Sequence, residues 1–550
     1  MKTSAALNPA QRSEDLERMA DEVFDVLVVG GGVTGAGTAL DGASRGLSTA
    51  LVEQRDYASG ASSRSSKLFH GGIRYLERLN FGLVSEALAE RNLMLKTICP
   101  HLARPVSFVY PLKYPVWERL YVGAGVLIYD LMARRSGSPL PSREHLSRRE
   151  LSELAPGLDA EKTHGAVRYW DAQVDDARHT VFVARTARAH GAALASSARV
   201  TAIEPGAHSV MATVRDLETG ADATVEARAV INAAGVWSDD IGEMAGGAGL
   251  NVRASKGIHL VVPRQRIAAE AGLILRTEAS VLFVIPFGDH WIIGTTDTPW
   301  TLRRAHPAAS KSDIDYLLKW VNTVLTSPLR ADDVVGVFAG LRPLLSGESD
   351  DTSKLSREHA VVDNGRRTIS IAGGKYTTYR VMARDAIDAA ARYLKTPVPP
   401  SRTDKTPLIG AEPARDGDRL AARYGSLAAD VRRLIERDRS LGEPVAPDAP
   451  YTGAELVYAA THEGALHLDD FLTRRTRISI ETRHRGADAA EPAARLVAPH
   501  LGWPETTIRR ELEHYLARVE AERDSQRQPD DHTADAARMG APDVRTGRAE

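Results

Sequence analysis

The stretch FDVLVVGGGVTGAG, residues 24–37, decides the fold. Five of its first six residues are apolar, three of these are valines, and the run ends in glycines, which is typical of a buried parallel strand. A helix is predicted over residues 33–45. Between strand and helix lies the pattern G-x-G-x-x-G, with Gly30 for a tight turn, Gly32 for close approach of a pyrophosphate and Gly35 for close helix–strand packing. Because the helix N-terminus would face the phosphates with unpaired N–H groups, the stretch predicts a dinucleotide site.

The residues that follow complete this unit. Residues 48–53 (STALVE) have the pattern of a second parallel strand, at the spacing of a βαβ unit of about 30 residues. Glu53 ends this strand, where a carboxylate accepts the ribose hydroxyls of a dinucleotide. A carboxylate disfavours a 2′-phosphate, so FAD or NAD is predicted over NADP. A glycine-rich turn without a ligand would explain the glycines, but not the surrounding strand, helix and Glu53.

Composition and charge exclude several classes of protein. The chain has 550 residues, of which 43% are hydrophobic and 26% charged, as in ordinary soluble globular proteins. At roughly 100 to 200 residues per domain, it should form about two to four domains. Seventy Lys and Arg residues against 72 Asp and Glu residues leave a net charge of −2, so no nucleic-acid partner is predicted. The single cysteine, Cys99, cannot form a thiolate metal cage or an intramolecular disulfide, which indicates a reducing, cytosolic compartment without a metal site.

Later segments indicate a mixed α/β fold. β-Hairpins are predicted over residues 210–231 and 281–295, so we expect a Rossmann-like parallel sheet with an interleaved antiparallel β subdomain for the substrate. Three prolines between residues 397 and 400 mark a boundary. Both ends of the chain are polar, which favours flexibility. The predicted organisation is a flexible leader (1–22), a main domain with interleaved cofactor- and substrate-binding parts (23–396), a linker (397–404), a mainly helical C-terminal domain (405–520) and a disordered tail (521–550).

Three more motifs suggest ligand contacts. INAAGVW (231–237) and ISIAGGKYTTYR (369–380) each place small residues at a strand end, where the chain can pass close to a cofactor. Lys375, Thr377 and the N–H groups that start the second motif's helix would stabilise negative charge, for example on a reduced flavin. SSRSSKLFHGGIRY (62–75) is polar, basic and glycine-bearing, as binding loops are. Taken singly, these patterns are equally explained by strand-to-helix packing, a plain helix cap and solvated arginines.

Together, the motifs resemble the FAD-dependent glycerol-3-phosphate dehydrogenase family, within the wider D-amino-acid-oxidase-like flavoproteins. The resemblance covers roughly residues 24–520 and also includes FGLVSEALAER (81–91), YWDAQVDDAR (169–178), KGIHLVVPR (256–264), IIGTTD (292–297), GLRPL (340–344) and RRTRI (474–478). GGGVTGAG is shared by many unrelated enzymes. The order HGGIRYL, KGIHLVVPR, GLRPL and GGKYTTYR is far more specific.

The resemblance implies oxidation of sn-glycerol 3-phosphate to dihydroxyacetone phosphate, with electrons passing through FAD to a membrane quinone. C2 of the substrate must give a hydride to the flavin, its hydroxyl must lose a proton, and cations must hold its phosphate. Arginine suits the last task because its planar fork binds phosphate in bidentate fashion. By resemblance, the substrate is surrounded by Arg74, Tyr75, Arg342, Arg357 and Lys375, with Arg74 and Arg357 on the phosphate. The FAD contacts implied in the same way are Gly30, Gly32, Gly35, Glu53, Ser65, Ser66, Lys67, His70, Gly235, Asp297, Gly374 and Thr377.

The proton acceptor stays open between His259 and Arg342, which both match residues near the C2 hydroxyl in the family. His259 is the better base, because the intrinsic pKa of histidine is about 6.5 and that of arginine exceeds about 12. A lone histidine in a strand is, however, more often structural. The sequence departs from the family pattern at Phe69, where Ile or Val is usual, and at Tyr376, where Leu or Phe is usual. Neither departure removes a charge.

Other functions remain to be weighed. A glycerol-3-phosphate oxidase would share the fold and the substrate but pass electrons to oxygen, releasing hydrogen peroxide. An amino-acid oxidase would need one arginine for a carboxylate, whereas the several basic residues here favour a dianionic phosphate. A flavin-binding sensor would need the cofactor glycines but not Arg74, His259, Arg342 and Lys375. We therefore expect a quinone-linked dehydrogenase, with the oxidase as the alternative.

A quinone acceptor implies contact with the membrane. Residues 117–135 (WERLYVGAGVLIYDLMARR) are the best candidate, since aromatic residues and terminal arginines flank an apolar centre that is too short and too charged to span a bilayer. A helix buried against the flavin domain is the alternative, because apolar residues at helical spacing could face a core: Leu120, Leu127, Ile128 and Leu131. The protein is thus expected in the cytoplasm, peripherally bound to the inner face of the cell membrane. The sequence leaves open a homodimer, and whether RRTRI lies against the main body or at a subunit contact.

Overall fold

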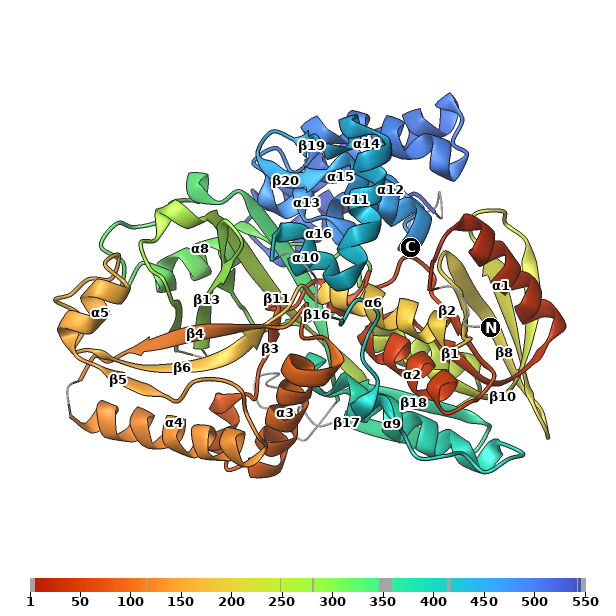
Figure 1. Cartoon of the computed structure of the whole chain (residues 1–550), viewed down its shortest axis with the longest axis horizontal. Helices are drawn as coiled ribbons and strands as arrows, with labels where there is room; N and C mark the ends of the chain where they lie inside the picture. The colour runs from red at the N-terminus through yellow and green to blue at the C-terminus, as the bar shows by residue number, and fades with distance from the viewer. Residues whose placement is uncertain are drawn as a thin grey trace.

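The computed structural model describes residues 5–114, 116–247, 249–278, 281–345, 359–412, 417–541 and 543–545. The chain folds into three parts, shown in Figure 1. A sheet with its helices lies to the right in this view, a second sheet lies to the left, and a group of helices lies above their junction. The predicted α/β fold with a helical C-terminal domain is confirmed.

The first sheet is the nucleotide-binding one. Its strands are β1 (Val23–Val29), β2 (Thr49–Val52), β7 (Ala193–Ala195), β8 (Ala198–Pro205), β9 (Val210–Asp216), β10 (Asp222–Asn232), β17 (His359–Asp363) and β18 (Thr368–Gly373). Strands β18, β10, β1, β2 and β7 are parallel neighbours in this order, and β17 joins β18 antiparallel. One face is covered by α2 (Val33–Ser44), α6 (Asp176–Ala189) and α9 (Tyr379–Ala390), and the other by α1 (Pro9–Asp21) and the β8–β9 hairpin. Coverage of both faces explains why β1 and β2 are continuous apolar runs.

The glycines of the first motif act as the sequence predicts. A Cβ on Gly35 would lie 1.8 Å from the carbonyl oxygen of Gly30, so only glycine lets α2 pack this closely on the turn. Gly30 has φ +112°, a conformation that other residues rarely adopt. The helix then ends before Gly46, whose φ of +87° provides the left-handed conformation that often follows a helix.

The second sheet is mainly antiparallel, with one parallel pair between β4 and β12, and it is interleaved with the first along the chain. Its strands are β3 (Leu68–Phe69), β4 (Arg104–Pro111), β5 (Glu144–Leu146), β6 (Ala166–Gln173), β11 (Val252–Pro263), β12 (Gly272–Arg276), β13 (Val281–Phe287), β14 (His290–Gly294), β15 (Thr298–Trp300) and β16 (Gly336–Leu345). The predicted hairpin is β13–β14, and β11 pairs with both β14 and β16. Helix α8 (Lys311–Val321) packs on the sheet and closes a separate hydrophobic core.

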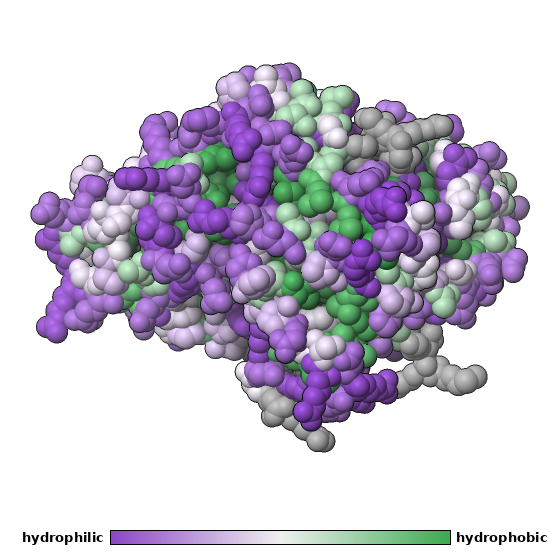
Figure 2. Space-filling model, turned by 90° about the horizontal axis from the view of Figure 1, so that it is seen from above, coloured by the Kyte–Doolittle hydropathy of each residue, from purple (hydrophilic) through white to green (hydrophobic). Residues whose placement is uncertain are grey.

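The C-terminal part is mainly helical and has its own core. It contains α10 (Arg419–Tyr424), α11 (Ala428–Arg437), α12 (Gly453–His462), α13 (Ile478–Glu481), α14 (Ala487–Leu501), α15 (Glu505–Ser525) and α16 (Asp531–Arg538), with a small hairpin of β19 (Pro444–Ala446) and β20 (Ala449–Thr452). Figure 2 shows the top of the molecule, where hydrophilic side chains dominate and hydrophobic areas are smaller.

The flexible leader predicted for residues 1–22 is wrong for the described residues, which form helix α1. Its polar side chains are partly buried: Arg12 donates to the Ser196 carbonyl at 2.7 Å and pairs with Asp216, and Asp15 accepts from the Leu194 N–H at 2.9 Å. The alternating polar pattern therefore reflects hydrogen bonds to the sheet rather than solvation.

The disordered tail predicted for residues 521–550 is also wrong for the described part. Helix α15 continues to Ser525, and α16 buries Ala534 and Arg538. Low hydrophobicity predicts disorder only when charges have no partners within the fold. Here they have partners, since Arg538 lies 3.4 Å from Glu522.

Two helices lie at the lower edge of Figure 1, α3 (Phe81–Leu93) and α4 (Trp117–Arg135). The two interpretations of segment 117–135 correspond to two faces of α4. Val126, Tyr129 and Ala133 are buried against the second sheet. The leucines and isoleucine that could equally have faced a core are exposed: Leu120, Leu127, Ile128 and Leu131. Among the described residues, no helix has the length and apolar character needed to cross a bilayer.

Candidate active site

A cavity of about 1210 Å³ lies where the two sheets meet. Its walls come from the turn after β1, from β11 and β16 of the second sheet, and from the glycine turn after β18. The volume exceeds the roughly 300–1,000 Å³ of usual ligand pockets, as expected for a dinucleotide with a substrate beside it. The cavity is lined by thirteen of the predicted site residues: Gly30, Gly32, Glu53, Ser65, Ser66, His70, Tyr75, Gly235, His259, Asp297, Arg342, Gly374 and Lys375.

The other five predicted residues are not among the described residues that line the cavity. Arg357 lies outside the described residues, and so does the side chain of Arg74. Gly35 lies behind the turn. Thr377 accepts from the His70 N–H at 3.1 Å and supports the wall from behind. Lys67, expected at the cofactor, points instead into the protein.

The position of Lys67 behind the cavity wall has a clear physical cause. Its ammonium group is fully buried, 2.8 Å from Asp176, and donates to the Ser63 carbonyl. Asp176 also accepts from Ser65 and pairs with Arg477 at 2.6 Å. A buried cation needs such partners, and these hold the Ser65–Lys67 loop against α6. The Lys67 ammonium group therefore holds the cofactor loop in shape from behind the cavity wall.

The nucleotide end of the cavity fits a dinucleotide. Gly32 and Gly235 face open space: a Cβ on Gly32 would meet only the Ser62 hydroxyl, at 3.2 Å, and one on Gly235 would meet nothing within 4 Å. Glu53 is buried at the end of β2, where its oxygens accept from the Gly31 N–H at 2.6 Å and the Arg55 N–H at 2.8 Å. Burial raises the pKa of Glu53 above its ordinary value. Each carboxylate oxygen has a second lone pair that can accept a ribose hydroxyl.

The other end of the cavity is cationic. Arg342 projects from β16 and donates to the Thr295 hydroxyl at 2.9 Å and the Thr296 carbonyl at 3.2 Å, while Asp297 lies 3.5 Å away. These contacts hold the guanidinium in one orientation. Lys375 follows the left-handed Gly373 and Gly374, and its Nζ lies 4.1 Å from the centre of the Tyr75 ring. This end can bind an anionic substrate between two fixed cations.

His259 lies beside Arg342 on neighbouring strands. It shares a 2.9 Å hydrogen bond with Ser66 through Nε2 and stacks on Phe338, with ring centroids 4.7 Å apart. Burial lowers the pKa of His259 well below 6.5, and the positive charges of Arg342 and Lys67 lower it further. At neutral pH the imidazole is therefore uncharged and able to accept a proton.

The two departures from the family pattern touch each other. The rings of Phe69 and Tyr376 lie 5.7 Å apart, and the Tyr376 hydroxyl donates to the Asp176 carbonyl at 2.7 Å. His179 completes the cluster, edge-on to Phe69 and 2.9 Å from the Tyr376 hydroxyl. The larger rings thus fill one shared space, and Tyr376 still lines the cavity.

The structure adds site residues that the sequence analysis did not single out. The Tyr129 hydroxyl of α4 accepts from the Gly71 N–H at 2.8 Å and donates to Asp171 at 2.7 Å, which pairs with Arg91 at 2.6 Å. In the sequence, the only indication of a role for Asp171 is its place in the motif YWDAQVDDAR.

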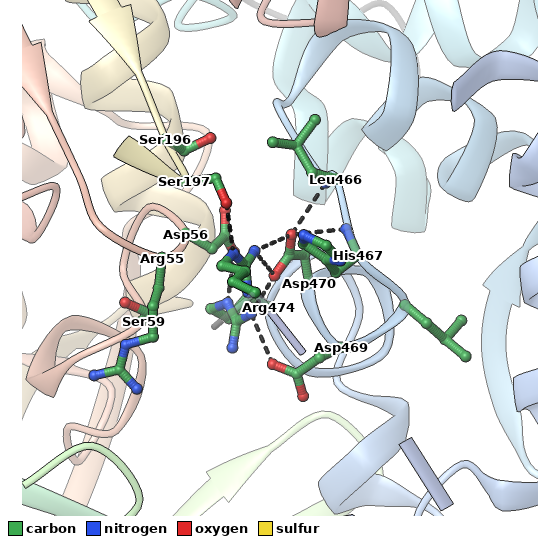
Figure 3. A network of polar contacts seen from close by, with 12 residues as sticks. Arg55, Asp56, Ser59, Ser196, Ser197, Leu466, His467, Asp469, Asp470 and Arg474 are labelled. Carbon is green, nitrogen blue, oxygen red and sulfur yellow. Dashed lines mark hydrogen bonds and ion pairs between the residues drawn. The ribbon is translucent and has the colours of Figure 1, made fainter. Parts of the chain in front are cut away.

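RRTRI lies against the main body. Figure 3 shows Arg474 between Asp56 of the nucleotide-binding part and the acidic residues of the C-terminal part. Arg474 pairs with Asp56 at 2.5 Å and Asp470 at 2.6 Å, and Arg475 pairs with Asp56 at 2.6 Å. The basic motif thus joins two parts of one chain.

A Rossmann-like sheet, a cradle of glycines over a dinucleotide-sized cavity and a cationic end with a neutral histidine define a flavin-dependent oxidoreductase. The comparisons with known proteins agree. Residues 25–380 match the FAD dependent oxidoreductase family, and residues 367–508 match the C-terminal domain of alpha-glycerophosphate oxidase.

The chain is 52% identical to glycerol-3-phosphate dehydrogenase 2 of Mycobacterium tuberculosis H37Rv, over 98% of this chain and 96% of that protein. It is 36% identical to the mitochondrial glycerol-3-phosphate dehydrogenase of Mus musculus, over 89% and 72% of the two chains. The glycerol-3-phosphate dehydrogenase of Bacillus halodurans complexed with FAD superposes with a TM-score of 0.75 at 27% identity, covering 94% of this chain and 98% of that one. The chain belongs to the FAD-dependent glycerol-3-phosphate dehydrogenase family, and its cofactor is FAD.

Proposed function

We propose that this protein oxidises sn-glycerol 3-phosphate to dihydroxyacetone phosphate and passes the electrons through FAD to a membrane quinone. The observation that carries the proposal is the cationic end of the cavity, where Arg342 and Lys375 line the same cavity as the neutral His259. Relatives named as glycerol-3-phosphate dehydrogenases over nearly the whole chain support the choice of substrate.

We assign substrate binding to the cationic residues and proton transfer to the neutral histidine. Arg342 and Lys375 attract the dianionic substrate, and the fixed guanidinium orients it. Arg74 and Arg357, in motifs that match the family, are proposed to hold the phosphate. FAD, when bound, supplies the hydride acceptor. His259 takes the proton of the C2 hydroxyl, with Arg342 as the alternative acceptor, and Ser66 keeps the imidazole in place through the Nε2 hydrogen bond.

Membrane contact is proposed through the outer face of α4. Trp117 is 56% exposed, Leu120 69% and Leu131 57%. Leu79 and Phe81, at the start of the contacting helix α3, are also exposed. Arg134 and Arg135 end the helix and can meet anionic headgroups. Large exposed apolar side chains on one helix favour an interaction surface. The proposed location is the inner face of the cell membrane. A homodimer is also proposed, and the molar mass in solution would test it.

The first experiment tests substrate and acceptor together. Purified holoenzyme is mixed with sn-glycerol 3-phosphate without oxygen, and flavin absorbance is followed. Bleaching by glycerol 3-phosphate but not by glycerol supports the substrate, and absence of bleaching contradicts it. Re-oxidation by a quinone analogue in air with little peroxide supports the dehydrogenase, whereas stoichiometric hydrogen peroxide identifies the oxidase alternative.

The second experiment tests the membrane surface. Leu120 and Leu131 are replaced by Asp, and liposome co-sedimentation is measured beside turnover with a water-soluble dye. Leu516→Asp on α15 is the matched control, since Leu516 is 44% exposed on another part of the molecule. Lost sedimentation with retained dye turnover supports the proposal, and unchanged sedimentation contradicts it. Val126 is unsuitable because it is only 3% exposed.

A further inference from the structure

The chain after α15 returns to the cofactor cavity. We call residues 526–541 and 543–545 the C-terminal strap. Its helix α16 lies between the C-terminal helices and the junction of the two sheets in Figure 1. This segment has no role in the proposed reaction, yet it contacts both sheets that form the cavity.

The first contact is with the substrate sheet. Asp531 lies 2.5 Å from the Nζ of Lys256, a fully buried cation that also pairs with Asp313 at 2.5 Å. The Ser310 hydroxyl donates to Asp531 at 3.1 Å, and the Lys311 N–H donates to the Gln528 carbonyl at 2.8 Å. Lys256 is on β11, three residues before His259. The strap is thus tied to a strand that carries a cavity residue.

The second contact is apolar and lies between the sheets. Ala534 is fully buried in a cluster with Val236, Trp300, Ala308 and Leu341. Val236 follows β10 of the nucleotide sheet, and Leu341 belongs to β16 of the substrate sheet. Both line the cavity. Ala534 therefore packs behind both walls at once.

The third contact is with the nucleotide side. Arg545 donates to the Ser197 hydroxyl at 3.1 Å and pairs with Asp470 at 2.8 Å. Its side chain is 3% exposed and lines the same cavity as Glu53. Figure 3 shows Ser197 facing Asp470 across this junction. Asp543 adds a contact 3.8 Å from His306.

We infer that the C-terminal strap is part of the FAD site and slows release of the cofactor. It joins the two sheets across the cavity: Asp531 pairs with Lys256 on the substrate side, and Arg545 contacts Ser197 on the nucleotide side. We expect release of a bound dinucleotide to require that the two walls move apart, which would break these ion pairs and expose Ala534. Contacts that must break before release lower the dissociation rate more than they change association.

The test measures FAD release directly. Holoenzyme is diluted into buffer with an excess of an apoprotein that binds FAD tightly, and loss of bound FAD is followed by flavin fluorescence at a temperature well below Tm. Arg545→Gln and Asp531→Asn each remove one charged contact, and a chain ending at Ser525 removes the strap. We expect release to be about tenfold faster in each point variant, the factor that corresponds to one lost contact of about 1.4 kcal/mol, and faster still without the strap.

Two controls separate retention from general stability. His532→Ala changes an exposed side chain of α16 and should leave both FAD release and turnover unchanged. Ile508→Ala removes buried packing from α15 away from the cavity, so it lowers Tm without touching the strap contacts. Release that accelerates in the Arg545 and Asp531 variants but not in Ile508→Ala supports the inference. Unchanged release in both point variants, or equal acceleration in Ile508→Ala, overturns it.

Discussion

At the scale of single residues, the site is governed by how each charge is held. Arg342 has three fixed partners, and Lys67 is neutralised by Asp176 behind the wall. His259 is uncharged because it is buried between cations. The cavity thus presents positive charge and a neutral base to the ligand, the combination needed for oxidation of an anionic alcohol.

His259→Asn should lower kcat more than it raises KM, by about 10²- to 10⁴-fold, if His259 is the proton acceptor. The kcat/KM profile of the unmodified enzyme should fall on the acid side only well below pH 6.5, because the pKa of His259 is lowered and the neutral form is the active one. Steady-state kinetics across pH measure both. Unchanged kcat in His259→Asn with an inactive Arg342→Ala would move the assignment to Arg342.

Tyr129→Phe should raise KM for glycerol 3-phosphate by about tenfold while the FAD content stays the same. The change removes only the hydroxyl that joins the Gly71 N–H to Asp171, and an unsatisfied buried donor costs about 1–3 kcal/mol. Ring packing on Tyr169 is retained. Kinetics and flavin absorbance are the measurements, and Tyr121→Phe on the exposed face of α4 is the control. Wild-type KM in Tyr129→Phe would show that the loop does not depend on this bond.

At the scale of elements, the segment Asp470–Arg475 and the preceding loop attach the C-terminal helices to the nucleotide-binding part. His467 lies 2.8 Å from Glu218 of the first sheet and 3.0 Å from Glu511 of α15. These two carboxylates raise the pKa of His467 to about 9, although burial and Arg545 oppose the shift. The imidazolium is therefore a charged link between two parts of the molecule.

This link predicts a pH dependence of stability. A group whose pKa is raised on folding stabilises the protein fully below its unfolded pKa of about 6.5. That stabilisation, of the order of 3 kcal/mol for this shift, is lost as pH rises towards 9. His467→Gln should lower the denaturant midpoint at pH 6 and flatten its decline between pH 6.5 and 9. Equal declines in both proteins would assign the pH dependence to other groups.

At the scale of the whole molecule, the cavity lies between two sheets, and the chain passes from one sheet to the other several times. The nucleotide sheet holds Gly30 and Glu53, and the substrate sheet holds His259 and Arg342. We expect FAD to contact both sheets and so to add binding free energy to their association. Ligand binding to the folded state alone stabilises it by mass action.

Removal of FAD should therefore lower the apparent Tm of the whole chain and make it depend on added FAD. At 100 times the dissociation constant, the cofactor contributes about 2.7 kcal/mol, which corresponds to several degrees. Differential scanning fluorimetry of apo- and reconstituted protein measures the shift. Adenosine alone, which cannot bridge the sheets, should stabilise less. An apo Tm equal to the holo Tm would contradict a bridging cofactor.

Much of the fold followed from local sequence. The strand, glycine turn and helix of residues 24–37 are set by side-chain periodicity and by the backbone freedom of Gly30, which act within a few residues. The hairpin β13–β14 followed from alternation and a turn. The order of the motifs also predicted that His259, Arg342 and Lys375 belong to one site, although more than 100 residues separate His259 from Lys375. All three line the cavity.

Only the tertiary structure decided how charged residues are used. Composition made α1 and the C-terminal strap resemble flexible ends, and the family resemblance placed Lys67 at the cofactor. In the structure, charged side chains of these three segments pair with residues that are distant in the sequence: Asp216, Lys256 and Asp176. Local sequence determines backbone conformation because the forces that set it act between neighbours. Whether a charge faces solvent, ligand or a buried partner depends on long-range contacts, which exist only once the chain has folded.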